Sequence, residues 1–380
     1  MISHPLTLDI VRGAAELAPD EHGVAVHRLP RAVRERFPDP LLLDRESQPS
    51  GVRVAFETTG SRVALTLHTT RAVFRGLDRS RGTVDVLVDG ALHAREELTG
   101  GDAIETDLRT GARDHRDGAP HTVTVDLPDG ASTVEFWLPH NETVRLVDLH
   151  VDAPIAPART DGVRRWVHHG SSISHGSNAT APSEIWPAVA ARAADGVELT
   201  NLGFGGSAMV DPFMARVIRD TPADVISVKL GINVVNGDVM RLRSFVPAVH
   251  GFLDTIRDGH PDTPLLVISP LHCAIHEATP GPGAFDPDAL AAGEVRFTAT
   301  GDPSEVAAGR LTLEAIRDAL RDVAARRSDD ANLTLVDGLA LFGAADEERL
   351  PLPDALHPGP AAHRLIGERF APYLARYLAR

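Results

Sequence analysis

Hydrophobic and polar residues alternate with a period of two along the first part of the chain, up to about residue 150. Clear alternating segments begin at Val52, Arg62, Thr83, His121 and Thr143. Such alternation is typical of strands that bury one face and expose the other. Turn-forming Asp-Gly and Thr-Gly pairs separate these segments at short spacing. The pattern therefore predicts an all-β sandwich or jelly roll of antiparallel strands.

From residue 164 onward, short apolar segments are separated by amphipathic ones. Continuous apolar segments are typical of strands that are buried on both faces of a parallel sheet. We expect five strands, at 166–170, 197–203, 223–231, 264–272 and 333–338, of which the third is an apolar segment of this kind.

The amphipathic segments between these strands predict helices, the first of which has Ser183 as a plausible N-cap. Strands that alternate with helices predict a doubly wound α/β domain with a parallel five-stranded sheet. The expected helices lie at 183–194, 211–220, 241–258, 311–327 and 360–378.

A segment rich in proline and alanine separates the two patterns. We expect an N-terminal β-sandwich domain at 1–155, a linker at 156–163 and an α/β domain at 164–380. A chain of 380 residues is long enough for two domains.

The composition excludes several classes of partner. The chain carries 38 lysine and arginine residues against 53 aspartate and glutamate residues, a net charge of −15. This balance argues against nucleic acid and against anionic membranes as partners. Cys273 is the single cysteine, so no disulfide within the chain is possible, and neither a signal peptide nor a membrane-spanning segment is recognised. We expect a cytoplasmic protein; the oligomeric state is not predicted.

Unusual residues gather at the ends of three predicted strands and before the last helix. These segments are Gly170–Gly176, Asn201–Ser207, Gly231–Asn233 and Asp354–Pro358. The carboxyl ends of parallel strands meet at one edge of a sheet, where ligands bind. A serine, a histidine, an aspartate and several amide donors are the groups that nucleophilic acyl transfer needs.

In these segments the sequence resembles the SGNH hydrolases, also called the GDSL family of serine esterases and lipases. Their four blocks match residues 170–173 (Gly-Ser-Ser-Ile), 201–206 (Asn-Leu-Gly-Phe-Gly-Gly), 231–233 (Gly-Ile-Asn) and 354–358 (Asp-Ala-Leu-His-Pro). The resemblance covers roughly residues 164–380 and implies the flavodoxin-like fold of that family. It agrees with the fold that the periodicity predicts independently.

The resemblance implies a role for each matching residue. Ser172 would be the nucleophile, His357 its general base and Asp354 the carboxylate that orients the histidine. The oxyanion donors would be the N–H groups of Ser172 and Gly206 and the side chain of Asn233. This chemistry requires no cofactor and no metal. The choice of Ser172 among Ser171, Ser172 and Ser174 depends on the alignment of the first block.

Two residues depart from the family's blocks. Ser171 replaces the aspartate of the first block, and Val234 replaces that of the third. Both substitutions would change the wall of the pocket, so we count Ser171 and Val234 among the candidate substrate contacts. The other two candidates are His175, beside the first block, and His272, at the end of the fourth predicted strand.

The sequence thus predicts an enzyme that hydrolyses carboxylic esters of small molecules through an acyl-enzyme on Ser172. The alternative within this chemistry is an acyltransferase that moves the acyl group onto a small-molecule hydroxyl, as in natural-product tailoring. The layout, with a sandwich before the catalytic domain, resembles that of an SGNH-type acyltransferase. A carbohydrate-binding protein with an inactive α/β domain is the alternative from another class.

Two other motifs suggest dinucleotide binding and metal binding, but each motif is incomplete. Gly203–Ala208 matches the dinucleotide fingerprint G-x-G-x-x-A, but the next strand ends at Gly231 without the acidic residue that binds the ribose. His272, Cys273 and His276 lack a second ligand pair at zinc-site spacing and are interpreted as a loop that lines the pocket.

Overall fold

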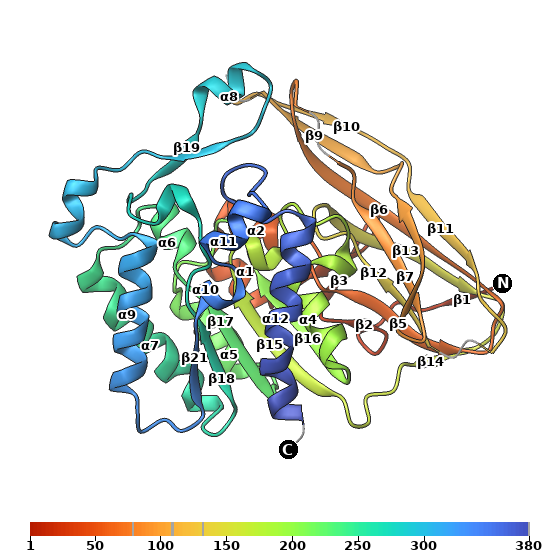
Figure 1. Cartoon of the computed structure of the whole chain (residues 1–380). Coiled ribbons are helices and arrows are strands. Elements are labelled where there is room, and N and C mark those ends of the chain that lie inside the picture. Colours follow the sequence, from red (N-terminus) through yellow and green to blue (C-terminus); the bar gives the residue numbers. More distant parts are fainter. Residues whose placement is uncertain (78–79, 108–109, 131–132, 379–380) are drawn as a thin grey trace. The chain divides into compact units, whose positions relative to one another are not determined.

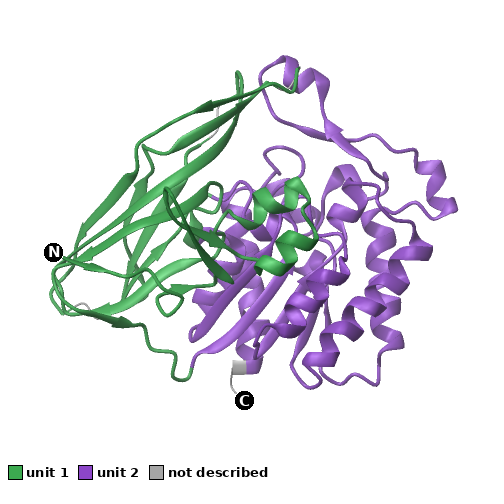
Figure 2. Ribbon diagram, turned by 180° about the vertical axis from the view of Figure 1, so that it is seen from behind, with its two compact units in different colours: residues 1–162, 180–183 green, residues 163–179, 184–380 purple. Residues whose placement is uncertain are grey.

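The computed structural model describes residues 1–77, 80–107, 110–130 and 133–378. The chain divides into two compact units, which Figure 2 draws in green and purple. Unit 1 comprises Met1–Gly162 together with Thr180–Ser183, and unit 2 comprises Val163–Ala179 together with Glu184–Arg380. The described residues contain no helix that is long and apolar enough to cross a membrane.

The described residues of unit 1 form two β-sheets. In the larger sheet the order is β10-β9-β6-β13-β4-β3, with β1 on β13 and β11 on β6. All its pairs are antiparallel except β6 with β9, which is parallel. Its strands are β1 (Ile2–His4), β3 (Glu16–Asp20), β4 (Gly23–His27), β6 (Arg62–Phe74), β9 (Asp102–Thr106), β10 (Arg113–Arg116), β11 (His121–Asp126) and β13 (Thr143–Val151).

The smaller sheet of unit 1 has the order β14-β5-β12-β7-β8, with β2 on β5. Its strands are β2 (Val11–Arg12), β5 (Arg53–Thr58), β7 (Thr83–Val88), β8 (Ala91–Glu97), β12 (Thr133–Trp137) and β14 (Ile155–Pro157). Fully buried side chains from both sheets, such as Phe56, Leu65 and Phe136, form one hydrophobic core. The period-two pattern therefore produces the expected β-rich N-terminal fold.

Unit 1 also contains two short helices that the periodicity did not predict, α1 (Arg31–Arg36) and α2 (Pro40–Glu46). Local signals begin α2: Pro40 is its first residue, and the Asp39 side chain accepts a hydrogen bond from the Leu42 N–H at 2.8 Å. Proline at N1 and aspartate at the N-cap are both favoured at helix starts. These signals are too short to stand out from the surrounding loops.

Unit 2 is built on a parallel five-stranded sheet with the order β16-β15-β17-β18-β21. All five predicted strands are present, with bounds that differ from the expected ones only at the ends. This order places the first strand between the second and the third, as in flavodoxin-like folds, and thus confirms the predicted fold class. The strands are β15 (Arg164–Gly170), β16 (Val197–Gly203), β17 (Val225–Lys229), β18 (Leu265–Ile268) and β21 (Leu333–Val336).

Helices cover both faces of this sheet, as Figure 1 shows. On one face, Trp166 of β15 stacks on Phe370 of α12 with ring centroids 5.4 Å apart. On the other face, His169 stacks on Phe252 of α7 at 6.1 Å. The helices of unit 2 are α3 (Ser172–His175), α4 (Trp186–Ala194), α5 (Pro212–Asp220), α6 (Ile232–Asn236), α7 (Leu242–Gly259), α8 (Pro287–Ala291), α9 (Leu313–Arg326), α10 (Gly338–Leu341), α11 (Ala344–Arg349) and α12 (Pro360–Leu378).

The prediction that Ser183 caps the first long helix is wrong. This helix, α4, begins at Trp186 with Ile185 as its N-cap. Ser183 lies before it in a 3₁₀ turn, and its hydroxyl donates to Asp85 Oδ2 at 2.6 Å within unit 1. The fully buried carboxylate of Asp85 competes for the hydroxyl that would otherwise cap the helix.

A β-hairpin that the sequence analysis did not predict lies between β18 and α9. Its strands are β19 (Gly283–Phe285) and β20 (Phe297–Ala299), which pair antiparallel, with α8 between them. Strands of three residues are too short for periodicity to reveal.

Candidate active site

Ser172 is the accessible serine of the first block. The strand β15 ends at Gly170, and α3 begins at Ser172 with Ser171 as its N-cap. The Ser171 hydroxyl accepts a hydrogen bond from the Ile173 N–H, and both Ser171 and Ser174 are fully buried. Ser172 is partly exposed. Of these three hydroxyls, therefore, only that of Ser172 is open to a substrate.

Ser172, His357 and Asp354 form a continuous hydrogen-bonded chain. Ser172 Oγ lies 2.8 Å from His357 Nε2, and His357 Nδ1 lies 2.7 Å from Asp354 Oδ2. Because a carboxylate only accepts hydrogen bonds, an ionised Asp354 makes Nδ1 the donor. Nε2 is then free to accept the proton of the Ser172 hydroxyl. This is the arrangement that a serine nucleophile and its general base require.

Asp354 is held in its ionised form. Burial by itself would raise the pKa of this carboxyl, but hydrogen bonds and the charge of His357 lower it below its usual value. Asp354 Oδ1 accepts from the N–H groups of Leu356 and His357 at 3.0 and 2.7 Å. Asn178 Nδ2 donates to Oδ2 at 3.2 Å. Asn178 lies outside the four matching blocks, so no sequence motif points to it.

The three predicted oxyanion donors lie at strand ends of the same sheet. Ser172 is the first residue of α3, so its N–H has no partner within the helix. Asn233 lies on α6, and its Oδ1 accepts from the Ala208 N–H at 3.1 Å, which leaves Nδ2 as the donor of this side chain. Gly206 lies in the turn after β16 with a positive φ of 72°. The strand order brings these elements to one edge of the sheet.

Asn201, the first residue of the second block, ties β16 to the turn that carries Ser172. Its Nδ2 donates to the Ser174 carbonyl at 2.9 Å, and its Oδ1 accepts from the Gly203 N–H at 3.0 Å. A Cβ atom on Gly203 would lie 2.6 Å from the backbone nitrogen of His175. Only glycine permits this close approach of the two segments.

Two of the four candidate substrate contacts have no surface for a ligand. Ser171 and Val234 are fully buried, so in this structure neither side chain offers accessible surface. His175 is also buried, and its Nδ1 lies 3.2 Å from the Gly203 carbonyl, so it connects the turn to β16. His272 is partly exposed and pairs with Glu347 at 2.6 Å.

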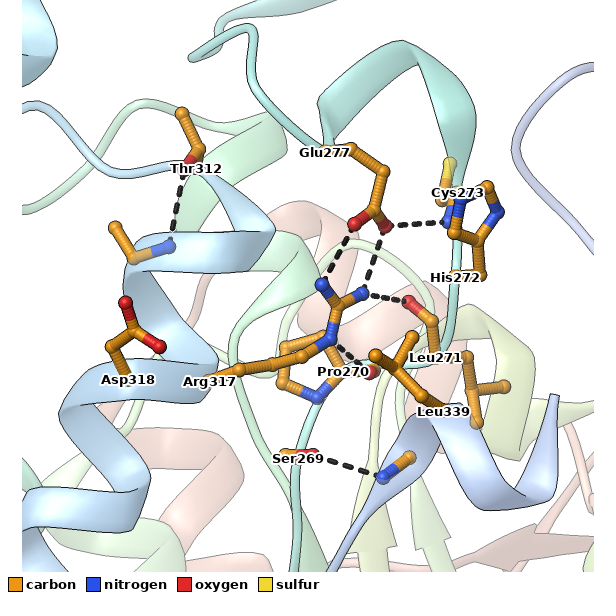
Figure 3. Close-up of polar contacts among 12 residues, drawn as sticks. Ser269, Pro270, Leu271, His272, Cys273, Glu277, Thr312, Arg317, Asp318 and Leu339 are labelled. Carbon is orange, nitrogen blue, oxygen red and sulfur yellow. Dashed lines mark hydrogen bonds and ion pairs between the residues drawn. The ribbon is translucent and has the colours of Figure 1, made fainter. Parts of the chain in front are cut away.

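The loop after β18, which carries His272 and Cys273, is fixed by a buried arginine. Figure 3 shows Arg317 of α9 donating to the carbonyls of Pro270 and Leu271, both at 2.9 Å, and to both oxygens of Glu277. Glu277 in turn accepts from the Cys273 N–H at 3.0 Å. The planar guanidinium suits this fork of acceptors.

The chemistry of this loop does not favour a nucleophilic or metal-binding role. Burial raises the pKa of the Cys273 thiol to about 12, so the reactive thiolate does not form at neutral pH. His276 Nε2 lies 3.2 Å from Asn236 Oδ1, and His272 pairs with Glu347, so the two histidines have separate partners.

A group of potential metal ligands occurs elsewhere, in unit 1. Ligand atoms of Asp102, His115 and Asp117 lie within 4.8 Å of one another. The side chains of His115 and Asp117 are exposed, and exposed groups of this kind are common without an ion.

A buried hydrogen-bonded network supports the turn that carries Ser172. His168 Nε2 lies 2.8 Å from Ser174 Oγ, and its Nδ1 lies 2.7 Å from Ser227 Oγ, which also accepts from Trp166 Nε1 at 2.8 Å. Complete burial lowers the pKa of His168 far below its usual value, so the ring is neutral and has one donor and one acceptor nitrogen. The network thus anchors Ser174, two residues after Ser172.

Burial also makes the stability of unit 2 depend on pH. His168, His169 and His363 are fully buried, and burial lowers the pKa of His169 and of His363 to about 4. Unfolded histidines titrate near 6.5, so between pH 6.5 and pH 4 the unfolded chain binds more protons than the folded one. Stability is therefore complete above pH 6.5 and falls as the pH is lowered. With three such groups, the free energy of unfolding falls by up to about 4 kcal/mol for each pH unit within this range.

Urea unfolding at pH 7, 6 and 5 would measure this slope. His169→Phe removes one titrating group whose Nε2 has no hydrogen-bond partner among the described residues, so we expect the slope to fall by about a third. A free energy of unfolding that does not change between pH 7 and 5 would contradict the prediction.

The fold is that of the SGNH-type esterases and acyltransferases, and the sequence comparison agrees. The sequence profile of the GDSL-like Lipase/Acylhydrolase family matches residues 169–365, and the chain belongs to this family. A second profile, of the N-terminal domain of SsfX3, matches residues 10–147. No protein among the curated sequences matches the chain.

Among solved structures, the salicylyl-acyltransferase SsfX3 from a tetracycline biosynthetic pathway is 27% identical, with a TM-score of 0.77. The match covers 96% of this chain and 94% of SsfX3. A Bacteroides ovatus protein described as a GDSL-like lipase is 18% identical, with a TM-score of 0.68 over 97% and 95% of the two chains. A family two carbohydrate esterase from Clostridium thermocellum, solved with cellohexaose, is 15% identical, with a TM-score of 0.56 over 87% and 93%. The last two matches show the fold alone.

Proposed function

We propose that the protein transfers acyl groups from an ester to the hydroxyl of a small molecule, through an acyl-enzyme on Ser172. The observation that carries the proposal is the chain Ser172–His357–Asp354, in which both contacts are shorter than 3 Å and the serine is partly exposed. A carbohydrate-binding protein with an inactive α/β domain has no need for this arrangement.

In the first half of the reaction, Ser172 Oγ attacks the carbonyl carbon of the donor as its proton passes to His357 Nε2. The negative charge on the carbonyl oxygen is stabilised by the N–H groups of Ser172 and Gly206 and by Asn233 Nδ2. The bond from the carbonyl carbon to the leaving alcohol then breaks, and His357 returns the proton to that alcohol. The product of this half is an ester of Ser172.

The second half repeats these steps with an acceptor. The hydroxyl of the acceptor gives its proton to His357 Nε2 and attacks the acyl carbon, and the proton then returns to Ser172 Oγ as the new ester leaves. Asp354 stays ionised and stabilises the charged imidazolium at each stage. All bonds and protons balance without a metal or a further cofactor.

Two observations bear on the identity of the acceptor. An alcohol is favoured because the chain is similar to a salicylyl-acyltransferase over nearly its whole length, including the N-terminal domain. Hydrolysis, in which water is the acceptor, is the second candidate, since the family includes acylhydrolases.

A partition experiment distinguishes the two acceptors. With an activated aryl ester as donor and a short alcohol present, we expect transfer to the alcohol far above its molar share relative to water. Mass spectrometry of the two products gives the ratio, and Ser172→Ala should form neither product above background. Hydrolysis alone at every alcohol concentration would contradict the transferase and support the esterase.

A further inference from the structure

Two phenylalanines face each other across the short hairpin between β18 and α9. Phe285 of β19 pairs with Phe297 of β20, and their ring centroids lie 5.0 Å apart at an interplanar angle of 32°. Both side chains are only partly buried. Most large apolar side chains of unit 2 lie in its core, whereas both residues of this pair keep part of their surface accessible.

The hairpin is attached to the loop that holds the catalytic histidine. The Phe297 N–H donates to the Asp354 carbonyl at 2.8 Å. The Phe297 ring meets the His357 imidazole edge to face, with centroids 5.6 Å apart and an interplanar angle of 79°. At the end of the hairpin, the Thr300 N–H donates to the Pro282 carbonyl at 2.9 Å. These contacts hold Phe297 beside the imidazole whose Nε2 faces Ser172.

The contact between Phe297 and His357 indicates which part of the substrate lies beside Phe297. His357 Nε2 gives its proton to the leaving alcohol and takes one from the incoming alcohol, so the alcohol oxygen must come within hydrogen-bond distance of Nε2. The remainder of the alcohol then lies against residues that flank the imidazole. The carbonyl oxygen of the acyl group points instead to the oxyanion donors at Ser172, Gly206 and Asn233, which lie on other elements.

We infer that Phe285 and Phe297 form the aromatic wall of the alcohol subsite, and that the acceptor is an aromatic hydroxyl compound. A flat ring can stack on the exposed surface of the pair, as aromatic rings do in offset or edge-to-face geometry. The inference rests on the proposed function, because it concerns the acceptor of the same acyl-enzyme.

The test compares two acceptors of similar size on one acyl-enzyme. A single activated ester supplies the acyl group, and benzyl alcohol competes with cyclohexylmethanol and with water. Because every product comes from the same intermediate, the product ratios report recognition of the acceptor independently of acylation. We expect the wild type to prefer benzyl alcohol to cyclohexylmethanol.

Phe297→Leu should lower this preference by about two- to tenfold, the range expected for one aromatic contact, and hydrolysis of the same acyl-enzyme supplies the reference product in each reaction. Phe285→Leu should act in the same direction and serves as the second variant if Phe297→Leu does not fold. Thr298→Ala is the matched control: successive side chains of a strand point to opposite faces, so it changes the other face of β20.

The possible outcomes separate the two proposals. An unchanged ratio of the two alcohols in both leucine variants would overturn the aromatic subsite and leave the acyl-enzyme on Ser172 intact. Equal losses in hydrolysis and in transfer to both alcohols would also overturn it, because Phe297 would then act only through His357. Activity that survives Ser172→Ala would instead refute the proposed function, and the inference with it.

Discussion

Ser172→Ala is expected to lower the turnover of an activated ester by about 10⁶, the loss typical of removing a serine nucleophile. The side chain is the partly exposed hydroxyl of its turn and lies 2.8 Å from His357 Nε2. Without it no acyl-enzyme forms. The oxyanion donors remain, so the residual rate should still exceed that in water by about 10³–10⁴. Steady-state kinetics with a chromogenic short-chain ester would measure both numbers.

The neighbouring serine provides the control for this variant. Ser171 is fully buried, and its hydroxyl only caps α3, so Ser171→Ala should change the turnover by less than about tenfold. A fluorophosphonate should label the wild type, and peptide mapping should place the adduct on Ser172. Full turnover in Ser172→Ala, or an adduct on Ser171 or Ser174, would refute the mechanism.

Asp354→Asn is expected to lower kcat by about 10⁴ while the protein stays folded. The wild-type carboxylate accepts the Nδ1 proton of His357 at 2.7 Å, and its lowered pKa keeps it ionised. An asparagine at this position can present its NH₂ group to Nδ1. The ring proton then moves to Nε2, which can no longer accept the proton of Ser172. Turnover measured together with circular dichroism would separate this effect from unfolding.

A substitution of Asn178 should lower kcat by less than the substitution of Asp354 does. Asn178 Nδ2 donates to Asp354 Oδ2 at 3.2 Å, and its backbone has a positive φ of 66°, which glycine tolerates. Asn178→Gly therefore removes one hydrogen bond to the carboxylate and keeps the backbone conformation, with an expected loss of about tenfold in kcat. Wild-type turnover in Asp354→Asn would show that His357 does not depend on this carboxylate.

The hydrophobic pattern predicts the parallel sheet of unit 2 well, because the alternation of short strand segments with amphipathic helices is a local signal along the chain. The pattern predicts the structure less well where residues distant in sequence compete as hydrogen-bond partners. Ser183 bonds to Asp85 instead of capping α4, and the strands of the Phe285–Phe297 hairpin are too short to show periodicity.

The sequence likewise identifies only some of the residues that act at the candidate active site. The four blocks identify the types and order of the residues around Ser172 and His357, since each block is a short local motif. Asn178 and Phe297 belong to no block, and their roles become visible only through contacts with Asp354 and His357. The same holds for His168, whose two ring nitrogens meet Ser174 and Ser227.

The sequence by itself determined the fold class, the family resemblance and the set of candidate residues, because periodicity and motifs are local properties of the chain. The tertiary structure decided which serine is open to a substrate, since burial depends on all the packed elements around a turn. It also decided that Ser172 and His357, 185 positions apart, lie within hydrogen-bond distance. Hydrogen bonds need atoms within about 3 Å and in the correct orientation, and only the folded sheet edge provides that geometry.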